Sequence, residues 1–158
     1  MAKITYVSAW QKHDERRERD AIALWKEHGV LPPGVTPEER AREICCLAYD
    51  GKRLAAISTI DIRPYRPLLN KRFGFLRVFT SPEYEGREIS IGLAKECRRL
   101  LEEWSVANPS EKLAGMAAVY QSPKYGKYPV GKSGLTLTGF TPEGHQVVVV
   151  WFNHLPVY

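Results

Sequence analysis

Long apolar runs are missing from this sequence: no stretch reaches the roughly 18 residues that a membrane-spanning helix needs. The first residues, Met1 to Gln11, also lack the apolar core of a secretion signal. From these two absences we expect a cytoplasmic protein that has no membrane association.

Cysteine is scarce, with three residues in a chain of 158. Cys45 and Cys46 are neighbours in sequence, which places them poorly for an ordinary disulfide, and Cys97 leaves an odd number. Their spacing does not match a metal-ligand pattern, so no metal site is expected. The simplest interpretation is that all three are buried core thiols.

The composition lacks the polar bias of disordered chains. Hydrophobic residues make up 44% of the sequence and charged residues 26%, close to the averages for soluble globular proteins. A chain of this length is typical of one compact domain. We therefore expect residues 1–158 to form a single domain.

Lysine and arginine outnumber aspartate and glutamate by 23 to 18, which gives a formal charge of +5. The excess is concentrated in two segments without acids, from Ile62 to Arg77 and from Lys112 to Pro142. Such a field is compatible with an anionic partner. Because no recognised nucleic-acid motif accompanies the charge, nucleic-acid binding ranks last among the functions considered.

Capping and stop residues divide the first third of the chain into short elements. Residues 3–10 alternate apolar and polar side chains, which is typical of a strand. Asp14 is a helix cap and Gly29 a helix stop, so a helix is predicted up to about His28. A threonine cap followed by proline and two acids predicts a second, short helix over residues 37–42.

Strands dominate the next part of the sequence. The dipeptide Asp50-Gly51 joins the apolar runs 43–49 and 53–62, which is the strongest short-range signal for a hairpin. A proline-containing connection leads to another apolar run, 73–80. We expect three antiparallel strands lying side by side.

The longest periodic segment predicts a helix over residues 86–105, with one apolar face. Further strands are expected over residues 113–120, 135–140 and 146–152. The strands before and after the long helix are expected to lie parallel through a right-handed crossover. The predicted fold is of the α/β class, a mixed sheet flanked by helices.

A distinctive place follows from this order of elements. The strand 73–80 runs through a tight loop into the long helix, and the N–H groups at a helix N-terminus have no helical partner and favour anions. From position alone an ordinary strand-to-helix turn is the preferred interpretation, because one glycine is a weak signal.

The residues around this loop resemble a known family. Residues 78–93 read VFTSPEYEGREISIGL, which is similar to the Val-x-Pro-Glu-Tyr-Arg-Gly-x-Gly-x-Gly loop of the GCN5-related N-acetyltransferases, or GNAT proteins. Gly139-Phe140 before a terminal apolar strand is similar to their Gly-Phe signature. The resemblance implies the GNAT-like acyl-CoA N-acyltransferase fold, and transfer of acetyl from acetyl-CoA to a primary amine of a small molecule or protein.

The resemblance also implies which residues bind acetyl-CoA as co-substrate. Backbone groups of Val78 and Thr80 would bind the pantetheine arm. The pyrophosphate would be received by the N–H groups of Gly86, Arg87, Glu88, Ile89 and Ser90.

Three residues depart from the family pattern. Glu85 stands where the family has arginine or glutamine, Glu88 where it has glycine, and Ser90 where it has glycine or alanine. Carboxylates repel a diphosphate, and a side chain obstructs its closest approach. The alternative function is therefore a catalytically impaired GNAT-like binding or regulatory protein that acts through a protein partner.

The resemblance implies a tyrosine that protonates the leaving thiolate, but Leu135 occupies the usual position. Tyr128 or Tyr125 is the candidate for this role from a shifted position, with aromatic packing as the alternative. Asp61 and Glu83 are candidates for the general base. Alternatively, Asp61 pairs with a nearby arginine, Arg63 or Arg77, and Glu83 caps the long helix.

The last strand contains four consecutive valines, at positions 147–150. If it lies at a sheet edge, it can pair across subunits, which makes a homodimer an additional expectation.

Overall fold

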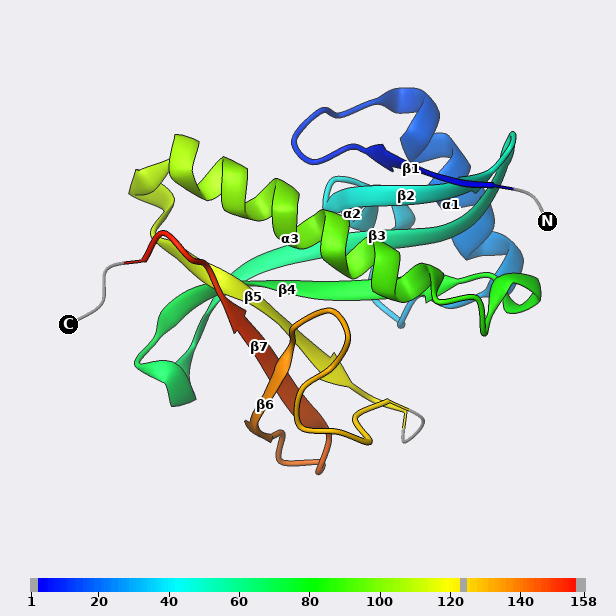
Figure 1. Ribbon diagram of the computed structural model, residues 1–158. Coiled ribbons are helices and arrows are strands. Elements are labelled where there is room, and N and C mark those ends of the chain that lie inside the picture. Colours follow the sequence, from blue (N-terminus) through cyan, green and yellow to red (C-terminus); the bar gives the residue numbers. More distant parts are fainter. Residues whose placement is uncertain (1–2, 123–124, 156–158) are drawn as a thin grey trace. The chain divides into compact units, whose positions relative to one another are not determined.

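A computed structural model describes residues 3–122 and 125–155 of the chain (Figure 1). The chain divides into two compact units. The first unit contains the chain up to Ile60 together with Arg77–Cys97, and the second contains Asp61–Leu76 together with the chain from Arg98 onward. The expectation of a single domain stays a prediction.

Helices flank a mixed seven-stranded sheet of order β1-β2-β3-β4-β5-β7-β6, as predicted for the α/β class. The strands are β1 (Ile4–Ser8), β2 (Ile44–Asp50), β3 (Arg53–Tyr65), β4 (Lys71–Thr80), β5 (Leu113–Tyr120), β6 (Thr136–Phe140) and β7 (Gln146–Trp151). The helices are α1 (Glu15–His28), α2 (Pro37–Ala41) and α3 (Ile89–Ala107), with short 3-10 turns η1 (Arg66–Leu68), η2 (Pro82–Tyr84) and η3 (Pro109–Glu111). Within the described residues, none of the helices is both long enough and apolar enough to cross a membrane.

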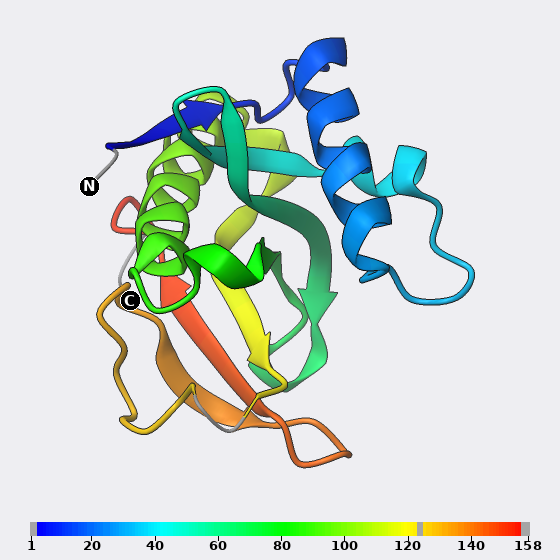
Figure 2. The same ribbon diagram turned by 90° about the vertical axis from the view of Figure 1, so that its right-hand side faces the viewer.

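The predicted helix caps are confirmed in the first unit. The Asp14 carboxylate accepts hydrogen bonds from the N–H groups of Arg16 and Arg17, at 3.0 and 3.3 Å, and α1 begins with the next residue, Glu15. The helix ends at Gly29, whose φ of +57° is in the left-handed region. The start and the length of α1 therefore follow from local chemistry. Figure 2 shows α2 beside α1.

Alternate side chains of β2 point to opposite faces of the sheet in the first unit. Leu47 and its register partner Ile57 pack with Leu24 and Trp25 of α1. Side chains alternate along a strand, so Cys46 and its partner Ser58 face the other way.

Ser58 connects this second face to α3. Its hydroxyl accepts a hydrogen bond from Cys46 N–H at 3.0 Å, donates to Cys46 O at 2.8 Å, and lies 3.0 Å from the sulfur of Cys97. Because the serine proton is used on the carbonyl, the Cys97 thiol is the donor in the third contact. Cys45, Cys46 and Cys97 are all buried free thiols, which confirms the prediction of core thiols.

In the second unit, β5 pairs with β4 in parallel over Arg72–Leu76, which confirms the predicted parallel pair. Strand β5 also pairs with β7, which in turn pairs with β6, both antiparallel. Phe73, Ala117 and Val149 contribute to the buried core of this unit.

The condition for pairing across subunits, an edge position of the last strand, is not met. Strand β7 lies between β5 and β6, and all four of its valines are buried. The backbone N–H and C=O groups on both sides of β7 are therefore hydrogen-bonded to neighbouring strands, while β6 has the edge position in the sheet order. A homodimer therefore stays a prediction without support from an exposed β7.

Helix α3 begins at Ile89, three residues later than predicted. Gly86 and Glu88 have φ values of +80° and +57°, which are left-handed and not compatible with the first turn of an α-helix. The prediction treated residues 86–88 as helical, whereas they form a loop before the helix.

Candidate functional site

The end of β4 is attached to β3 by a main-chain hydrogen bond. Ser81 N–H donates to Ala55 O at 2.9 Å, and the turn η2 follows directly. Within the turn, Tyr84 N–H donates to Ser81 O at 2.8 Å and Glu85 N–H donates to Pro82 O at 3.3 Å. These bonds fix where the chain leaves the sheet and approaches α3.

Residues 85–88 form an exposed loop that leads directly to the first residue of α3. Glu88 O accepts a hydrogen bond from Gly92 N–H at 3.2 Å, which is the first bond of the helix. The N–H groups of Ile89, Ser90 and Ile91 precede that bond, so none of them has an intrahelical acceptor. The loop therefore leads into a helix end that suits an anion.

Glu88 keeps a glycine-like backbone at the position where the GNAT pattern has glycine. Its φ of +57° is adopted freely by glycine but is strained for a residue with a Cβ atom. The loop thus has glutamate at this position, while its backbone has the left-handed conformation that glycine favours. The unpaired N–H groups at the start of α3 suit an anion, whereas the exposed carboxylates of Glu85 and Glu88 repel one.

Tyr84 and Arg53 are residues of this region that sequence reasoning did not assign to the site. The Tyr84 side chain is only 4% exposed, and its hydroxyl donates to Asp50 Oδ2 at 2.7 Å. That hydrogen bond is the main cause of the raised pKa of Tyr84. The guanidinium carbons of Arg87 and Arg53 lie 5.2 and 6.0 Å from the centroid of the Tyr84 ring.

The sequence contained one signal for Tyr84, its place in the Pro-Glu-Tyr segment of the loop motif. Its partner Asp50, however, is 34 residues away in the β2–β3 turn region. No local pattern connects the two residues.

Glu83 forms an ion pair with the Arg53 guanidinium. It lies in η2, and α3 begins six residues later, so Glu83 is not a cap of that helix. Its carboxylate is therefore engaged by a cation next to the loop. The role of Glu83 as a general base stays a prediction.

Val78 and Thr80 are half-buried residues near the end of β4. Phe79, between them, points toward the helix side, where its ring lies 5.4 Å from that of His28, at the end of α1. Because side chains alternate along a strand, Val78 and Thr80 face the opposite side. His28 itself is partly buried.

The other catalytic candidates belong to the second unit. Asp61 Oδ2 lies 3.8 Å from Arg63 Nε, and the Arg63 guanidinium lies 4.0 Å from the centroid of the Phe75 ring. The alternative in which Asp61 pairs with Arg63 is therefore observed.

Tyr125 and Tyr128 differ in their surroundings. The Tyr125 ring is 5.7 Å from the ring of Tyr120, and burial, with a smaller contribution from Tyr125, raises the pKa of Tyr120. Tyr128 is 76% exposed, compared with 45% for Tyr125. Aromatic packing thus accounts for Tyr125, whereas Tyr128 presents its ring to solvent. Leu135, at the usual position of the catalytic tyrosine, is buried.

The predicted site residues are divided between the two units. Those assigned to acetyl-CoA, together with Glu83, lie in the first unit, where the contacts of Tyr84 and Arg53 connect the loop to the β2–β3 hairpin. Asp61, Tyr125 and Tyr128 lie in the second. Their roles in catalysis stay predictions.

Solved structures with the same fold cover nearly the whole chain. A GNAT-family acetyltransferase from Listeria monocytogenes 4b F2365 is 16% identical, with a TM-score of 0.60 over 96% of this chain and 98% of that chain. The yncA protein from Salmonella typhimurium, solved with its cofactor acetyl-CoA, is 14% identical, with a TM-score of 0.60 over 98% and 96%. A mutant AtaT toxin bound to the C-terminus of the antitoxin AtaR is 13% identical, with a TM-score of 0.61 over 94% and 92%.

No protein-family model and no curated protein sequence matches the chain. At such low identities the structural likeness establishes the fold alone. The element order, the mixed sheet and the loop before the long helix agree with it. This chain has the fold of the GNAT acetyltransferases.

Proposed function

We propose that the protein is an N-acetyltransferase that moves acetyl from acetyl-CoA to a primary amine of a small molecule or protein. The observation that carries the proposal is the loop between β4 and α3 on a GNAT fold. There, a left-handed backbone at Glu88 leads into a helix end whose first N–H groups lack intrahelical acceptors. Acetyl-CoA would supply the acetyl group as a reactive thioester.

The main chain of the first unit would hold this co-substrate. Val78 and Thr80 would bind the pantetheine arm through their backbone groups. The diphosphate would be bound by the N–H groups of Gly86, Arg87, Glu88, Ile89 and Ser90. Binding through the backbone suits this chain, because the substitutions at Glu88 and Ser90 leave the amide donors in place.

Tyrosine and carboxylate side chains would carry out proton transfer. Tyr128 or Tyr125 would donate a proton to the departing thiolate, and Tyr128 has the more accessible hydroxyl-bearing ring. Asp61 or Glu83 would accept the proton of the acceptor ammonium, directly or through water. Glu83 would first have to exchange its ion pair with Arg53.

A second candidate function is a GNAT-like binding or regulatory protein that acts through a protein partner. The exposed Glu85 and Glu88 favour it, because they reduce the attraction of the loop for phosphate. The AtaT neighbour, which was solved bound to part of an antitoxin protein, is consistent with a protein partner on this fold.

Thermal unfolding with and without acetyl-CoA tests the choice between these functions. A ligand at 100 times its dissociation constant stabilises the native state by roughly 2.7 kcal/mol, so binding would raise the melting temperature. Pantetheine, which lacks the phosphates, is the control and is expected to give a smaller shift. No shift at millimolar acetyl-CoA would contradict the transferase and support the binding protein. Release of free thiol in the presence of primary amines would then test for transfer.

A further inference from the structure

Hydrogen bonds fix Tyr84 through both its backbone and its side chain. Its backbone N–H is bonded to Ser81 O within η2, and its hydroxyl is bonded to Asp50 Oδ2 at the end of β2. The residue as a whole is only 4% exposed. Tyr84 therefore has one position, set by both β2 and the turn after β4.

Arg87 lies over this fixed ring. The distance of 5.2 Å from its guanidinium carbon to the ring centroid is within the range of a cation–π contact, about 6 Å. The residue is exposed, and among the described residues Arg87 makes no ion pair. A ring face does not occupy the in-plane N–H donors of a guanidinium, so these donors remain available to a ligand.

Arg53 is on the same ring but differs in its charge balance. Its guanidinium is 6.0 Å from the ring centroid and is paired with the carboxylate of Glu83. The ion pair offsets its charge and occupies one of its donor nitrogens. Of the two arginines at Tyr84, Arg87 is thus the one available to bind an anion.

The loop needs a cation if it is to hold coenzyme A. Glu85 and Glu88 flank Arg87 in sequence and are exposed, so the three side chains together carry a formal charge of −1. Coenzyme A has a diphosphate and, beyond it on the ribose, a 3′-phosphate monoester. Backbone N–H groups at the start of α3 suit the diphosphate. A guanidinium on an exposed side chain suits the monoester, which offers bidentate geometry and nearly two negative charges.

We infer that Arg87 binds the 3′-phosphate of coenzyme A and that Tyr84 is a positioning residue that holds the guanidinium for this contact. The inference rests on the proposed function, since it assigns a specificity element to the same co-substrate. It gives the chain a preference for coenzyme A over its 3′-dephospho form, despite the acidic residues of the loop.

Calorimetric titration of the full chain with acetyl-CoA and with 3′-dephospho-acetyl-CoA tests the inference. A charge-assisted contact predicts that the wild type binds acetyl-CoA about tenfold to hundredfold more tightly than the dephospho form. Arg87→Ala is expected to remove this preference by weakening acetyl-CoA binding while leaving dephospho binding almost unchanged. Lys52→Ala, which removes an exposed cation from the nearby hairpin turn, is the control for long-range charge and should keep the preference.

Two substitutions of Tyr84 test its role as a positioning residue. Tyr84→Phe keeps the ring under Arg87 and should retain most of the preference, whereas Tyr84→Leu removes the ring and should lower it severalfold. Circular dichroism and the melting temperature identify a loss of folding in the Leu variant. If that variant does not fold, the Arg87→Ala result alone decides the inference, because Arg87 is exposed.

Three outcomes would overturn the inference. If Arg87→Ala keeps the preference, Arg87 does not bind the 3′-phosphate, while the proposed transferase stands. If Arg87→Ala weakens the binding of both ligands equally, Arg87 binds the diphosphate instead. If the wild type binds neither ligand, the proposed function and this inference fall together.

Discussion

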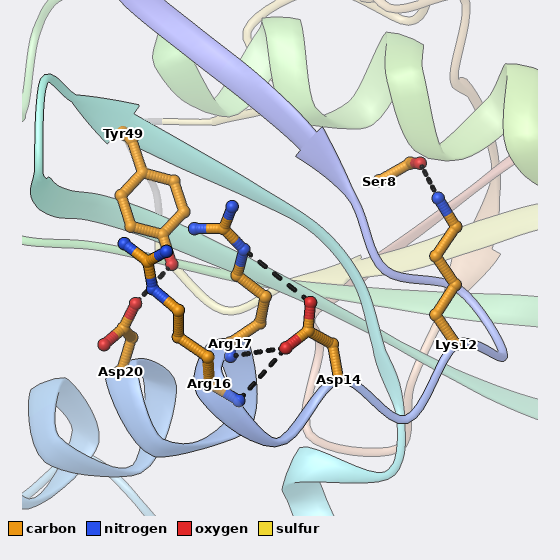
Figure 3. A network of polar contacts seen from close by, with 7 residues as sticks. All are labelled: Ser8, Lys12, Asp14, Arg16, Arg17, Asp20 and Tyr49. Carbon is orange, nitrogen blue, oxygen red and sulfur yellow. Dashed lines mark hydrogen bonds and ion pairs between the residues drawn. The ribbon is translucent and has the colours of Figure 1, made fainter.

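The Tyr49 hydroxyl donates a hydrogen bond to Asp20 Oδ2 at 2.7 Å and so joins β2 to α1 (Figure 3). The Arg17 guanidinium lies 4.8 Å from the centroid of the same ring. Burial, followed by the hydrogen bond to Asp20, raises the pKa of Tyr49 to about 12. The neutral tyrosine is therefore the form that the folded protein prefers.

Tyr49→Phe is expected to lower the free energy of unfolding by about 1 kcal/mol at neutral pH, because Asp20 loses its donor. The raised pKa sets the pH dependence. The contribution of Tyr49 is fully present below its ordinary pKa near 10 and is lost as pH rises through about 12. Urea unfolding between pH 8 and 12 should show the difference between wild type and variant closing over this window.

Asp20→Asn is the matched control for the cause of the shift. It keeps an acceptor but removes the charge, so the pKa of Tyr49 should move down toward 10. Absorbance at 295 nm, compared with that of Tyr49→Phe, isolates this titration. An unmoved titration would show that burial alone sets the pKa.

Gly115→Ala is expected to destabilise the second unit. A Cβ atom at Gly115 would lie 2.1 Å from the backbone oxygen of Val150, which cannot move without disturbing the β5–β7 pairing. We expect a loss of about 1–3 kcal/mol or more. Gly139→Ala in β6 is the control, since its Cβ would lie 3.9 Å from the nearest atom, the Tyr65 hydroxyl oxygen. Equal unfolding midpoints for the two variants in urea would contradict the close approach.

Glu88→Gly is expected to stabilise the protein by up to about 1 kcal/mol, because glycine adopts the φ of +57° without strain. It should also tighten acetyl-CoA binding by removing a carboxylate and a side chain from the loop. Glu85→Gly removes the same charge at a φ of −63°, so it should aid binding but not stability. A less stable Glu88→Gly would show that the Glu88 side chain contributes more than its backbone strain costs.

Tyr128→Phe is expected to lower turnover tenfold or more if Tyr128 protonates the thiolate, since general acid catalysis contributes about 10²–10⁴-fold. The dissociation constant of acetyl-CoA should not change, and neither should stability, because the side chain is 76% exposed. Tyr125→Phe, measured in parallel, distinguishes the two candidates. Unchanged turnover would remove Tyr128 from the role.

Local chemistry accounts for what could be predicted from the sequence. Asp14 and Gly29 define α1, and Asp50-Gly51 defines the β2–β3 hairpin, because each acts on residues within a few positions of itself. The fold class followed from the order of such elements.

The errors concern non-local features. The start of α3 was missed because Glu88 uses a backbone conformation that its residue type disfavours. Whether β7 lies at an edge was left open, because valine content does not encode strand order. Likewise, the contact of Tyr84 with Asp50 exists only after β2 and the turn following β4 have come together.

The chain passes from one compact unit to the other within helices and strands, and not in loops. The crossings fall between Ile60 and Asp61 in β3, between Leu76 and Arg77 in β4, and between Cys97 and Arg98 in α3. None of them is a linker, so limited proteolysis should find no accessible bond at these boundaries. Each unit consists of two separate chain segments, so no single truncation point yields one unit alone. A truncated fragment would contain incomplete strands or an incomplete helix. Dissection of this protein therefore calls for point substitutions within the intact chain.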